Sequence, residues 1–261
     1  MKLFQNILTV GFWTLISRIL GMVRDILLLA FIGVGPVLDA FIVAFRIPNM
    51  FRRFFAEGAL SAAFVPLYSK RLKRGKNAER FVLEAISGLT FVLLIGTGLG
   101  MVFMPCLVWA TASGFIGDER FEIAVEYGQI MFPYILLISL AALLSGALNA
   151  HGRFGIAAAA PTFLNIIIII ALFLAWVLSL QPVVFLVWSV PLAGIVQLSL
   201  LWLGARKSGI TVKFVRPRLS PGMRHLIKVA FPAALANGVV QINLLVGTIV
   251  ASYFPGAISW L

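Results

Sequence analysis

Long runs of apolar residues, separated by short polar connections, cover almost the whole chain. Most of these runs reach or exceed the roughly 20 residues that a helix needs to cross the hydrocarbon core of a bilayer. Glycine and proline interrupt the pattern and predict turns at 33–36, 181–182 and 255–256. The predicted spans cover about 3–33, 38–68, 81–110 and 124–150, then a fifth that ends near 180, a sixth that ends near 204, and a seventh over about 226–254. An eighth apolar segment begins after residue 256, so the pattern predicts an all-α polytopic membrane protein.

The composition supports this class and excludes a soluble domain. Of the 261 residues, 61% are hydrophobic and 11% are charged, and the mean hydropathy is +1.05. In soluble domains, about a quarter of all residues are charged. The single cysteine, Cys106, excludes an intrachain disulfide. The sequence has no zinc-ligand spacing, phosphate-binding glycine loop, Ser/His/Asp set or acidic pair for glycosyl transfer, and we predict a protein that is not an enzyme and has no metal and no cofactor.

The distribution of charge predicts the sides of the membrane. The net charge is +12, which could indicate nucleic acid, but the basic residues cluster in short loops. Lys/Arg-rich loops remain in the cytoplasm. The basic loops 69–80 and 206–224, together with Arg153 and Lys2, are therefore expected to be cytoplasmic, as is the N-terminus, and the acidic loop 117–122 is expected outside. We predict membrane lipids as partners and no nucleic acid.

Six spans return the chain to the side on which it began. A bundle that starts at the seventh span would then have the same orientation as the first, as in transporters with parallel repeats. We predict an N-terminal lobe of six transmembrane helices at 1–205, a basic cytoplasmic linker at 206–224, and the first span and the beginning of the next span of a second lobe at 225–261. The chain stops inside an apolar segment, so we expect it to be a fragment that does not transport alone.

Charged side chains lie inside the first two predicted spans. A charge near the bilayer centre costs roughly 2.5–3.5 kcal/mol on insertion scales, so such residues usually face a water-filled cavity. Between residues 18 and 57 there are five cations and three anions, which favours an anionic cargo. The planar guanidinium offers paired donors to a phosphate and keeps its charge when dehydrated. We expect Arg18, Arg24 and Arg52 to converge on such a cavity.

Simpler roles suffice for other polar residues. Arg46 and Arg53 are expected at interfaces or in structural ion pairs, since Arg53 and Glu57 are one helical turn apart. Asp39 suits a helix N-terminus, and Asn165 an interhelical hydrogen bond. Gly21 indicates a tilt, bend or break in the first span. Kinks are predicted at five prolines: Pro105, Pro133, Pro161, Pro191 and Pro232.

Specific segments of the chain resemble the MurJ (MviN) family of lipid II flippases. These segments are Ser17-Arg-Ile-Leu-Gly-Met-Val-Arg-Asp25, Asp39-Ala-Phe, Arg46-Ile-Pro-Asn-Met-Phe-Arg-Arg-Phe-Phe-Ala-Glu-Gly58, Ala160-Pro-Thr-Phe-Leu-Asn165 and 251–261. The resemblance implies a multidrug/oligosaccharidyl-lipid/polysaccharide exporter-like bundle in the bacterial inner membrane. It also implies flipping of the lipid-linked peptidoglycan precursor to the periplasmic leaflet during cell wall biogenesis, which maintains cell shape, with lipid II and cell-wall synthesis proteins as partners.

The resemblance also assigns roles to single residues. It implies that Arg18, Arg24 and Arg52 bind substrate, and it also implicates Asp39. We predict supporting or gating roles for Asp39 and for four further residues: Asp25, Arg53, Glu57 and Asn49. Some relatives bind sodium through an acid in the seventh span, which this chain lacks.

Four other functions remain open at this stage. A flippase for another polyprenyl-diphosphate-linked glycan would also require arginines in its cavity. A cation-coupled drug exporter of the same superfamily would require acidic residues in its cavity. An anion channel would conduct continuously, and a membrane glycosyltransferase would turn over a sugar donor.

Overall fold

The computed structural model describes residues 2–52, 61–75 and 77–260, and within them the chain forms helices and no strand. The elements are α1 (Lys2–Ile32), α2 (Pro36–Arg52), α3 (Ser61–Arg74), α4 (Ala78–Val102), α5 (Met104–Thr111), η2 (Ser113–Phe115), α6 (Glu119–Met131), α7 (Tyr134–Ala150), α8 (Phe154–Ala159), α9 (Thr162–Val177), α10 (Pro182–Lys207), α11 (Pro221–Ser252) and η3 (Ile258–Trp260). The predicted all-α class is therefore confirmed.

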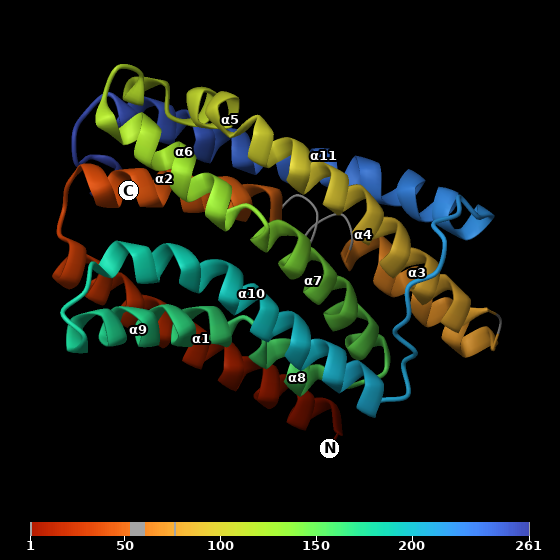
Figure 1. The fold of residues 1–261 in the computed structure, drawn as a ribbon. Helices are drawn as coiled ribbons and strands as arrows, with labels where there is room; N and C mark the ends of the chain where they lie inside the picture. The colour runs from red at the N-terminus through yellow and green to blue at the C-terminus, as the bar shows by residue number, and fades with distance from the viewer. Residues whose placement is uncertain (1, 53–60, 76, 261) are drawn as a thin grey trace.

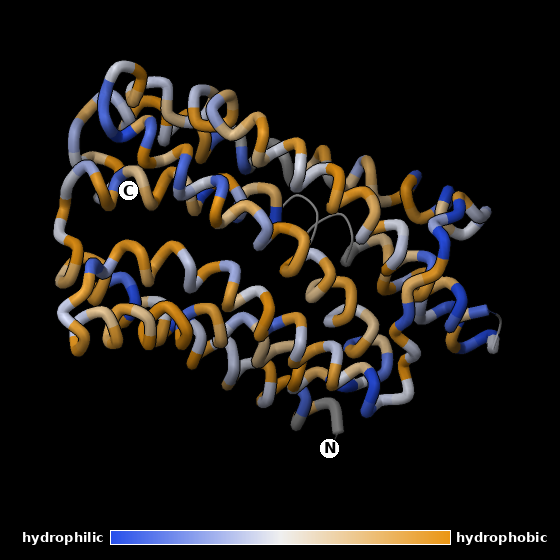
Figure 2. Tube along the Cα trace, viewed as in Figure 1, coloured by the Kyte–Doolittle hydropathy of each residue, from blue (hydrophilic) through white to orange (hydrophobic). Residues whose placement is uncertain are grey.

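The helices run between two ends of an elongated bundle (Figure 1). Helix α1 packs on α8 and α9, α10 packs on α7 and α9, and α2 packs on α6. The N-terminus and the connections after α3, α7 and α10 lie at one end, and the connections after α1, α9 and α11 lie at the other. Figure 2 shows hydrophilic colour gathered near the ends of α3 and α10. This arrangement has the alternation that the loop charges predict.

Three helical stretches among the described residues are long and apolar enough to cross a membrane. They are Ala78–Val102, Phe154–Val177 and Pro182–Lys207. Helices α6 and α7 together make a fourth if their bend of 41° is counted within one span. The six-span count for the first lobe stays a prediction.

Several predicted spans are interrupted, and proline accounts for three of the breaks. Proline has no N–H to donate and its ring clashes with the preceding turn. The 81–110 span breaks at Phe103, just before Pro105, and the 124–150 span bends at Phe132–Pro133. The fifth breaks at Ala160–Pro161. Pro191 and Pro232, in contrast, lie inside uninterrupted helices.

The first two predicted spans correspond to α1 and to the helices α2 and α3. Helix α1 continues without a break through Gly21. Within the predicted span 38–68, the described residues form α2 up to Arg52 and α3 from Ser61, and residues 53–60 lie outside the described part of the chain. Gly33, with a φ of 77°, makes the predicted turn between α1 and α2, since glycine adopts positive φ without a steric penalty.

The surface of the bundle is apolar, as a lipid-facing surface requires. Large side chains such as Phe91, Trp176 and Trp188 are exposed on α4, α9 and α10. Contiguous apolar surface of this kind marks contact with a membrane or a partner. Inside, Phe81, Phe64 and Tyr68 stack in a row that joins α3 to α4. This row of rings fixes α3 against α4.

Candidate functional site

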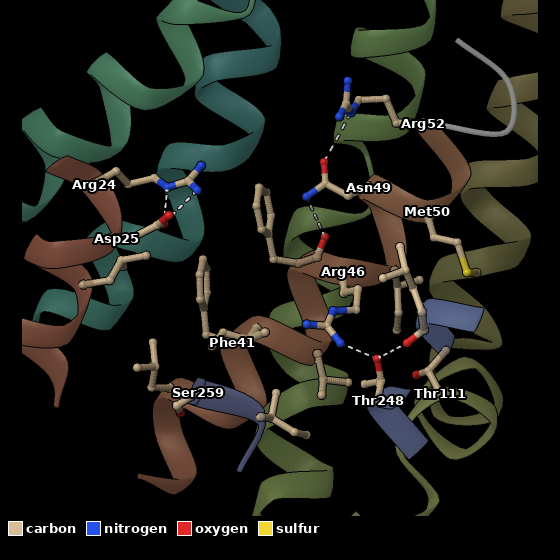
Figure 3. Close-up of a pocket in the computed structure, with 18 of the residues that line it drawn as sticks. Arg24, Asp25, Phe41, Arg46, Asn49, Met50, Arg52, Thr111, Thr248 and Ser259 are labelled. Carbon is tan, nitrogen blue, oxygen red and sulfur yellow. Dashed lines mark hydrogen bonds and ion pairs between the residues drawn. The ribbon is translucent and has the colours of Figure 1, made fainter. Parts of the chain in front are cut away.

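A cavity of about 660 Å³ lies between α1, α2 and α11. Its remaining walls come from α5, α9 and the segment after α11. The charged side chains on its described walls are Arg24, Asp25, Arg46 and Arg52, so three cations face one anion. Figure 3 shows Arg24 and Asp25 on one wall, and Arg46 and Arg52 on another. The cavity therefore carries excess positive charge, although most of the residues on its walls are apolar.

Arg24 is held by two acceptors from different helices. Its Nε and Nη2 donate to Asp25 Oδ1 at 2.9 and 2.8 Å, and its Nη1 donates to Asn165 Oδ1 at 2.9 Å. The side chain of Arg24 is 21% exposed and that of Asp25 is 60% exposed. Asn165 in turn donates from Nδ2 to the Ser17 carbonyl at 2.9 Å. The interhelical bond predicted for Asn165 is confirmed, and its effect is to orient the guanidinium.

Arg52 occupies the last turn of α2 on the same cavity. Its Nε donates to Asn49 Oδ1 at 3.3 Å, and Asn49 Nδ2 donates to the Phe45 carbonyl at 3.2 Å. A cation in the last turn also complements the negative end of the helix dipole. Arg52 therefore has a partner on its own helix, and Asn49 supports it.

Arg46, for which the sequence predicts an interfacial position or a structural ion pair, lies on the cavity wall. Its Nη1 donates to the Thr248 hydroxyl of α11, across 202 residues of sequence. Arg46, Thr248 and the neighbouring Thr111 all line the cavity (Figure 3). This position was not predicted from the sequence, because only the placement of α11 in the fold brings Thr248 to Arg46.

Not all expected residues meet at the cavity. Arg18 is exposed on α1 and does not line the walls that the structure describes. It precedes Arg24 by six residues, which rotates it by about 240° around the helix at roughly 100° per residue. Arg53 and Glu57 lie outside the described residues. The structure thus brings Arg24 and Arg52 to one cavity and leaves Arg18 outside it.

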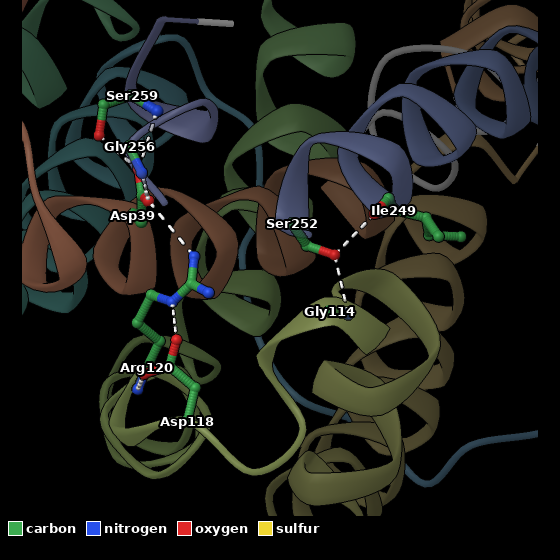
Figure 4. A network of polar contacts seen from close by, with 8 residues as sticks. All are labelled: Asp39, Gly114, Asp118, Arg120, Ile249, Ser252, Gly256 and Ser259. Atoms are coloured by element: carbon green, nitrogen blue, oxygen red, sulfur yellow. Dashed lines mark hydrogen bonds and ion pairs between the residues drawn. The ribbon is translucent and has the colours of Figure 1, made fainter. Parts of the chain in front are cut away.

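Asp39 forms a second polar centre at the other end of α2 (Figure 4). It is fully buried and accepts hydrogen bonds from Gly256 N at 2.7 Å, from Ser259 N at 3.0 Å and from Ser259 Oγ at 2.5 Å. Buried carboxylates need such donors. Asp39 therefore lies in the first turn of α2, as expected, and also fastens the segment that follows α11.

Arg120 provides the positive charge beside Asp39. Its Nη1 lies 3.7 Å from Asp39 Oδ2, its Nε donates to Asp118 Oδ2 at 2.5 Å, and its guanidinium lies over the ring of Phe115. Burial raises the pKa of Asp118, but the hydrogen bonds and charge of Arg120 outweigh it and the pKa is lowered. Residues 117–122 were predicted as an acidic loop from their overall composition, and Arg120, the buried cation within them, was therefore not singled out.

The cavity is suited to bind an anion. Arginines oriented by amides and a carboxylate present further N–H groups to a phosphate-like ligand without reorganisation. Among the described residues, no group of three or more His, Cys, Asp or Glu side chains is placed to hold a metal ion. The arrangement therefore favours recognition of a negatively charged group.

Comparison with known proteins covers the whole chain. The family model described as lipid II flippase MurJ matches residues 28–261. A protein of Rhizobium tropici described as a probable lipid II flippase MurJ is 44% identical over 268 residues, covering 100% of this chain and 50% of that protein. A Burkholderia cenocepacia protein described as lipid II flippase MurJ is 38% identical, with 100% and 52% covered. The chain spans about half the length of the curated relatives it matches.

Two solved structures share the fold of this chain. A lipid II flippase MurJ in an inward closed conformation superposes with a TM-score of 0.81 at 30% identity, over 96% of this chain and 52% of that one. A MOP superfamily transporter from Pyrococcus furiosus superposes with a TM-score of 0.70 at 16% identity, over 92% and 54%. The second likeness concerns the fold alone.

Proposed function

The chain belongs to the MurJ family of lipid II flippases, and on that premise we propose that it forms the first lobe of a flippase for lipid II. The cargo would be the lipid-linked peptidoglycan precursor, moved from the cytoplasmic to the periplasmic leaflet of the bacterial inner membrane. The process serves cell wall biogenesis and cell shape, with lipid II and the surrounding lipids as ligands and cell-wall synthesis proteins as partners.

The observation that carries the proposal is the charge of the cavity. Three arginines face one aspartate on its described walls, and a diphosphate is the anionic group that a polyprenyl-linked precursor offers. Arg24 and Arg52 would bind the diphosphate, with Asp25 and Asn49 holding them in place. The apolar part of the ligand would remain in the bilayer, where the exposed apolar surface of the helices lies.

The contacts of α11 suggest how the cavity is closed. Arg46 donates a hydrogen bond to the Thr248 hydroxyl, and Gly114 N donates to Ser252 Oγ at 2.9 Å. The Ser259 hydroxyl donates to Asp39. Each contact joins the first six predicted spans to residues of the predicted second lobe. In alternating access these contacts would break and re-form as the two lobes move about the central site.

Arg18 retains a proposed role in this cycle. It lies on the same helix as Arg24 and is exposed. A rocking movement of α1 changes which face of that helix borders the cavity, so we propose that Arg18 meets the substrate in another conformation. Arg53 and Glu57 keep their proposed supporting roles.

The orientation is part of the same proposal. We place the N-terminus and the connections after α3, α7 and α10 in the cytoplasm, because the basic residues gather there. The connection between α5 and α6, together with Glu119 at the start of α6, would then be periplasmic. The cargo would enter from the basic side.

The test is depletion of the protein that carries this chain from its cells. We expect lysis, with lipid II retained in the cytoplasmic leaflet and protected from an externally added lipid II-degrading enzyme. Lysis with lipid II accessible outside would contradict the proposal. Accumulation of a different polyprenyl-diphosphate glycan inside would favour the alternative cargo, and loss of drug export alone would favour the drug exporter.

A further inference from the structure

Residues 210–220 connect α10 to α11 at the end of the bundle that holds the N-terminus, and we call them the strap (Figure 1). The strap has no helix of its own, yet α4 fixes it at two points. Val215 N donates to Ser87 Oγ at 2.8 Å, and Ser220 Oγ donates to Glu84 Oε2 at 2.5 Å. Near its start, Ile210 and Val212 are buried in the core. The strap is therefore a positioned segment and presents a defined face outward.

The outward face mixes cations with large apolar side chains. All side chains from 213 to 219 are exposed, and the segment reads Lys213, Phe214, Val215, Arg216, Pro217, Arg218, Leu219. Phe214 is 58% exposed and Leu219 is 66% exposed. A purely solvated loop gains nothing from exposing such apolar side chains. The combination is typical of segments that lie in a membrane interface, with apolar tips in the acyl boundary and cations among the headgroups.

The location of Phe214 supports an interfacial depth. Its ring contacts that of Trp202 on α10, with centroids 5.9 Å apart. Helix α10 is one of the stretches long and apolar enough to cross the membrane, and Trp202 lies near its end. Tryptophan is enriched at the level of the headgroups. The strap therefore follows the bundle at the level where lipid phosphates lie.

The strap carries no acidic residue of its own to neutralise its positive charge. No Asp or Glu follows Glu126 in the sequence. Glu84, the acid that touches the strap, accepts from Arg80 Nε at 3.1 Å as well as from Ser220. The end of α3 adds further exposed cations. The field at this face thus favours anions.

We infer that the strap is a docking surface for the headgroups of anionic phospholipids in the adjacent leaflet. Lys213, Arg216 and Arg218 contact the phosphates, while Phe214 and Leu219 enter the acyl boundary. Each Lys or Arg near an anionic membrane surface raises the affinity for that surface about fivefold. Salt screens this attraction. The inference depends on the chain being embedded in a membrane and does not depend on which cargo is transported.

The experiment uses the protein that carries this chain, reconstituted in vesicles, with Cys106→Ala and a bimane fluorophore on Leu219→Cys. Brominated phosphatidylglycerol or brominated phosphatidylcholine quenches the fluorophore on contact. We expect stronger quenching by phosphatidylglycerol, and a smaller difference at high salt. Equal quenching by the two lipids would overturn the inference. Quenching by neither would place the segment in water and favour a soluble partner.

Two charge variants locate the effect. Changing Lys213, Arg216 and Arg218 to Gln is expected to abolish the preference for phosphatidylglycerol, while thermal unfolding confirms that the protein is folded. The matched control changes Lys70, Lys73 and Arg74 of α3 to Gln, with the same loss of charge at the same end. If the control abolishes the preference equally, the strap has no specific role. The labelled protein that keeps Lys213, Arg216 and Arg218 decides between the lipids even if a charge variant fails to fold.

Discussion

Asn165 on α9 accepts a hydrogen bond from Arg24 on α1 at 2.9 Å, although 141 residues separate them in the sequence. The same amide donates to the carbonyl of Ser17, which precedes Arg24 on α1 by about two turns. One side chain therefore fixes both the position of α1 against α9 and the direction of the guanidinium in the cavity.

Asn165→Leu removes the second acceptor of Arg24 and leaves Nη1 of this part-buried guanidinium without its amide partner. The cost is about 1–3 kcal/mol, and we expect a loss of about tenfold or more in complementation of depleted cells at a normal membrane level of the protein. Asn149→Leu makes the same chemical change on α7 away from the cavity and should be tolerated. Equal effects of the two variants would remove Asn165 from the site.

Lysine should not replace arginine in the cavity. Arg24 spreads three N–H groups over two acceptors, and a point charge cannot reproduce that geometry. We expect Arg24→Lys and Arg52→Lys to fail nearly as badly as the alanine variants in complementation, with Arg74→Lys on the exposed end of α3 as the tolerated control. Full activity of both lysine variants would leave only a general cationic cavity.

Arg18→Lys examines the proposal that Arg18 meets the substrate in another conformation. A bidentate contact made at any stage of the cycle is lost with lysine, so the variant should fail as Arg24→Lys does, with its membrane level unchanged. Tolerance of lysine would mean that Arg18 serves the membrane interface instead. Complementation and immunoblotting together give the answer.

The orientation can be measured with single cysteines in a Cys106→Ala background. Arg74 and Glu119 are both exposed, at opposite ends of the bundle. A membrane-impermeant maleimide added to intact cells, with the outer membrane made permeable, should label Glu119→Cys and not Arg74→Cys. Labelling of Arg74→Cys alone would reverse the proposed topology.

Arg120→Met is expected to destabilise the protein strongly. It leaves the buried Asp39 without its ion pair, and breaking a buried pair typically costs about 3–5 kcal/mol. The thermal unfolding midpoint should fall, while Arg153→Met, at an exposed arginine, should change it little. The double variant Arg120→Met/Asp39→Asn should recover part of the loss, and a simple sum of the two single losses would show that the residues are not coupled.

Gly114 is expected to reject even a methyl group. A Cβ there would lie 2.5 Å from backbone atoms of Ser252 and Tyr253, and overpacking of this kind costs about 1–3 kcal/mol. Gly114→Ala should therefore lower the unfolding midpoint and loosen the end of α11. Gly98→Ala, where nothing lies within 4 Å of the added atom, is the matched control, and an equal effect there would show that helix α11 does not pack closely on η2.

The sequence by itself determined the membrane class and the turn at Gly33. It also predicted the breaks beside Pro105, Pro133 and Pro161, although Pro191 and Pro232, predicted in the same way, lie inside uninterrupted helices. These features follow from local physics, since apolar length and the missing N–H of proline act within a few residues. The sequence also singled out Arg24 and Arg52 as charges that apolar surroundings must accommodate.

Only the tertiary structure decided which of these charges share a cavity. Arg46 reaches Thr248, Asp39 reaches Ser259 and Arg24 reaches Asn165 across 202, 220 and 141 residues. Arg18 and Arg24 look equivalent in sequence, yet the rotation of an α-helix directs them to different faces. The burial of Arg120 beside Asp39 likewise arises from the packing of α6 on α2. Long-range packing sets the partners of a side chain, and no local pattern contains that information.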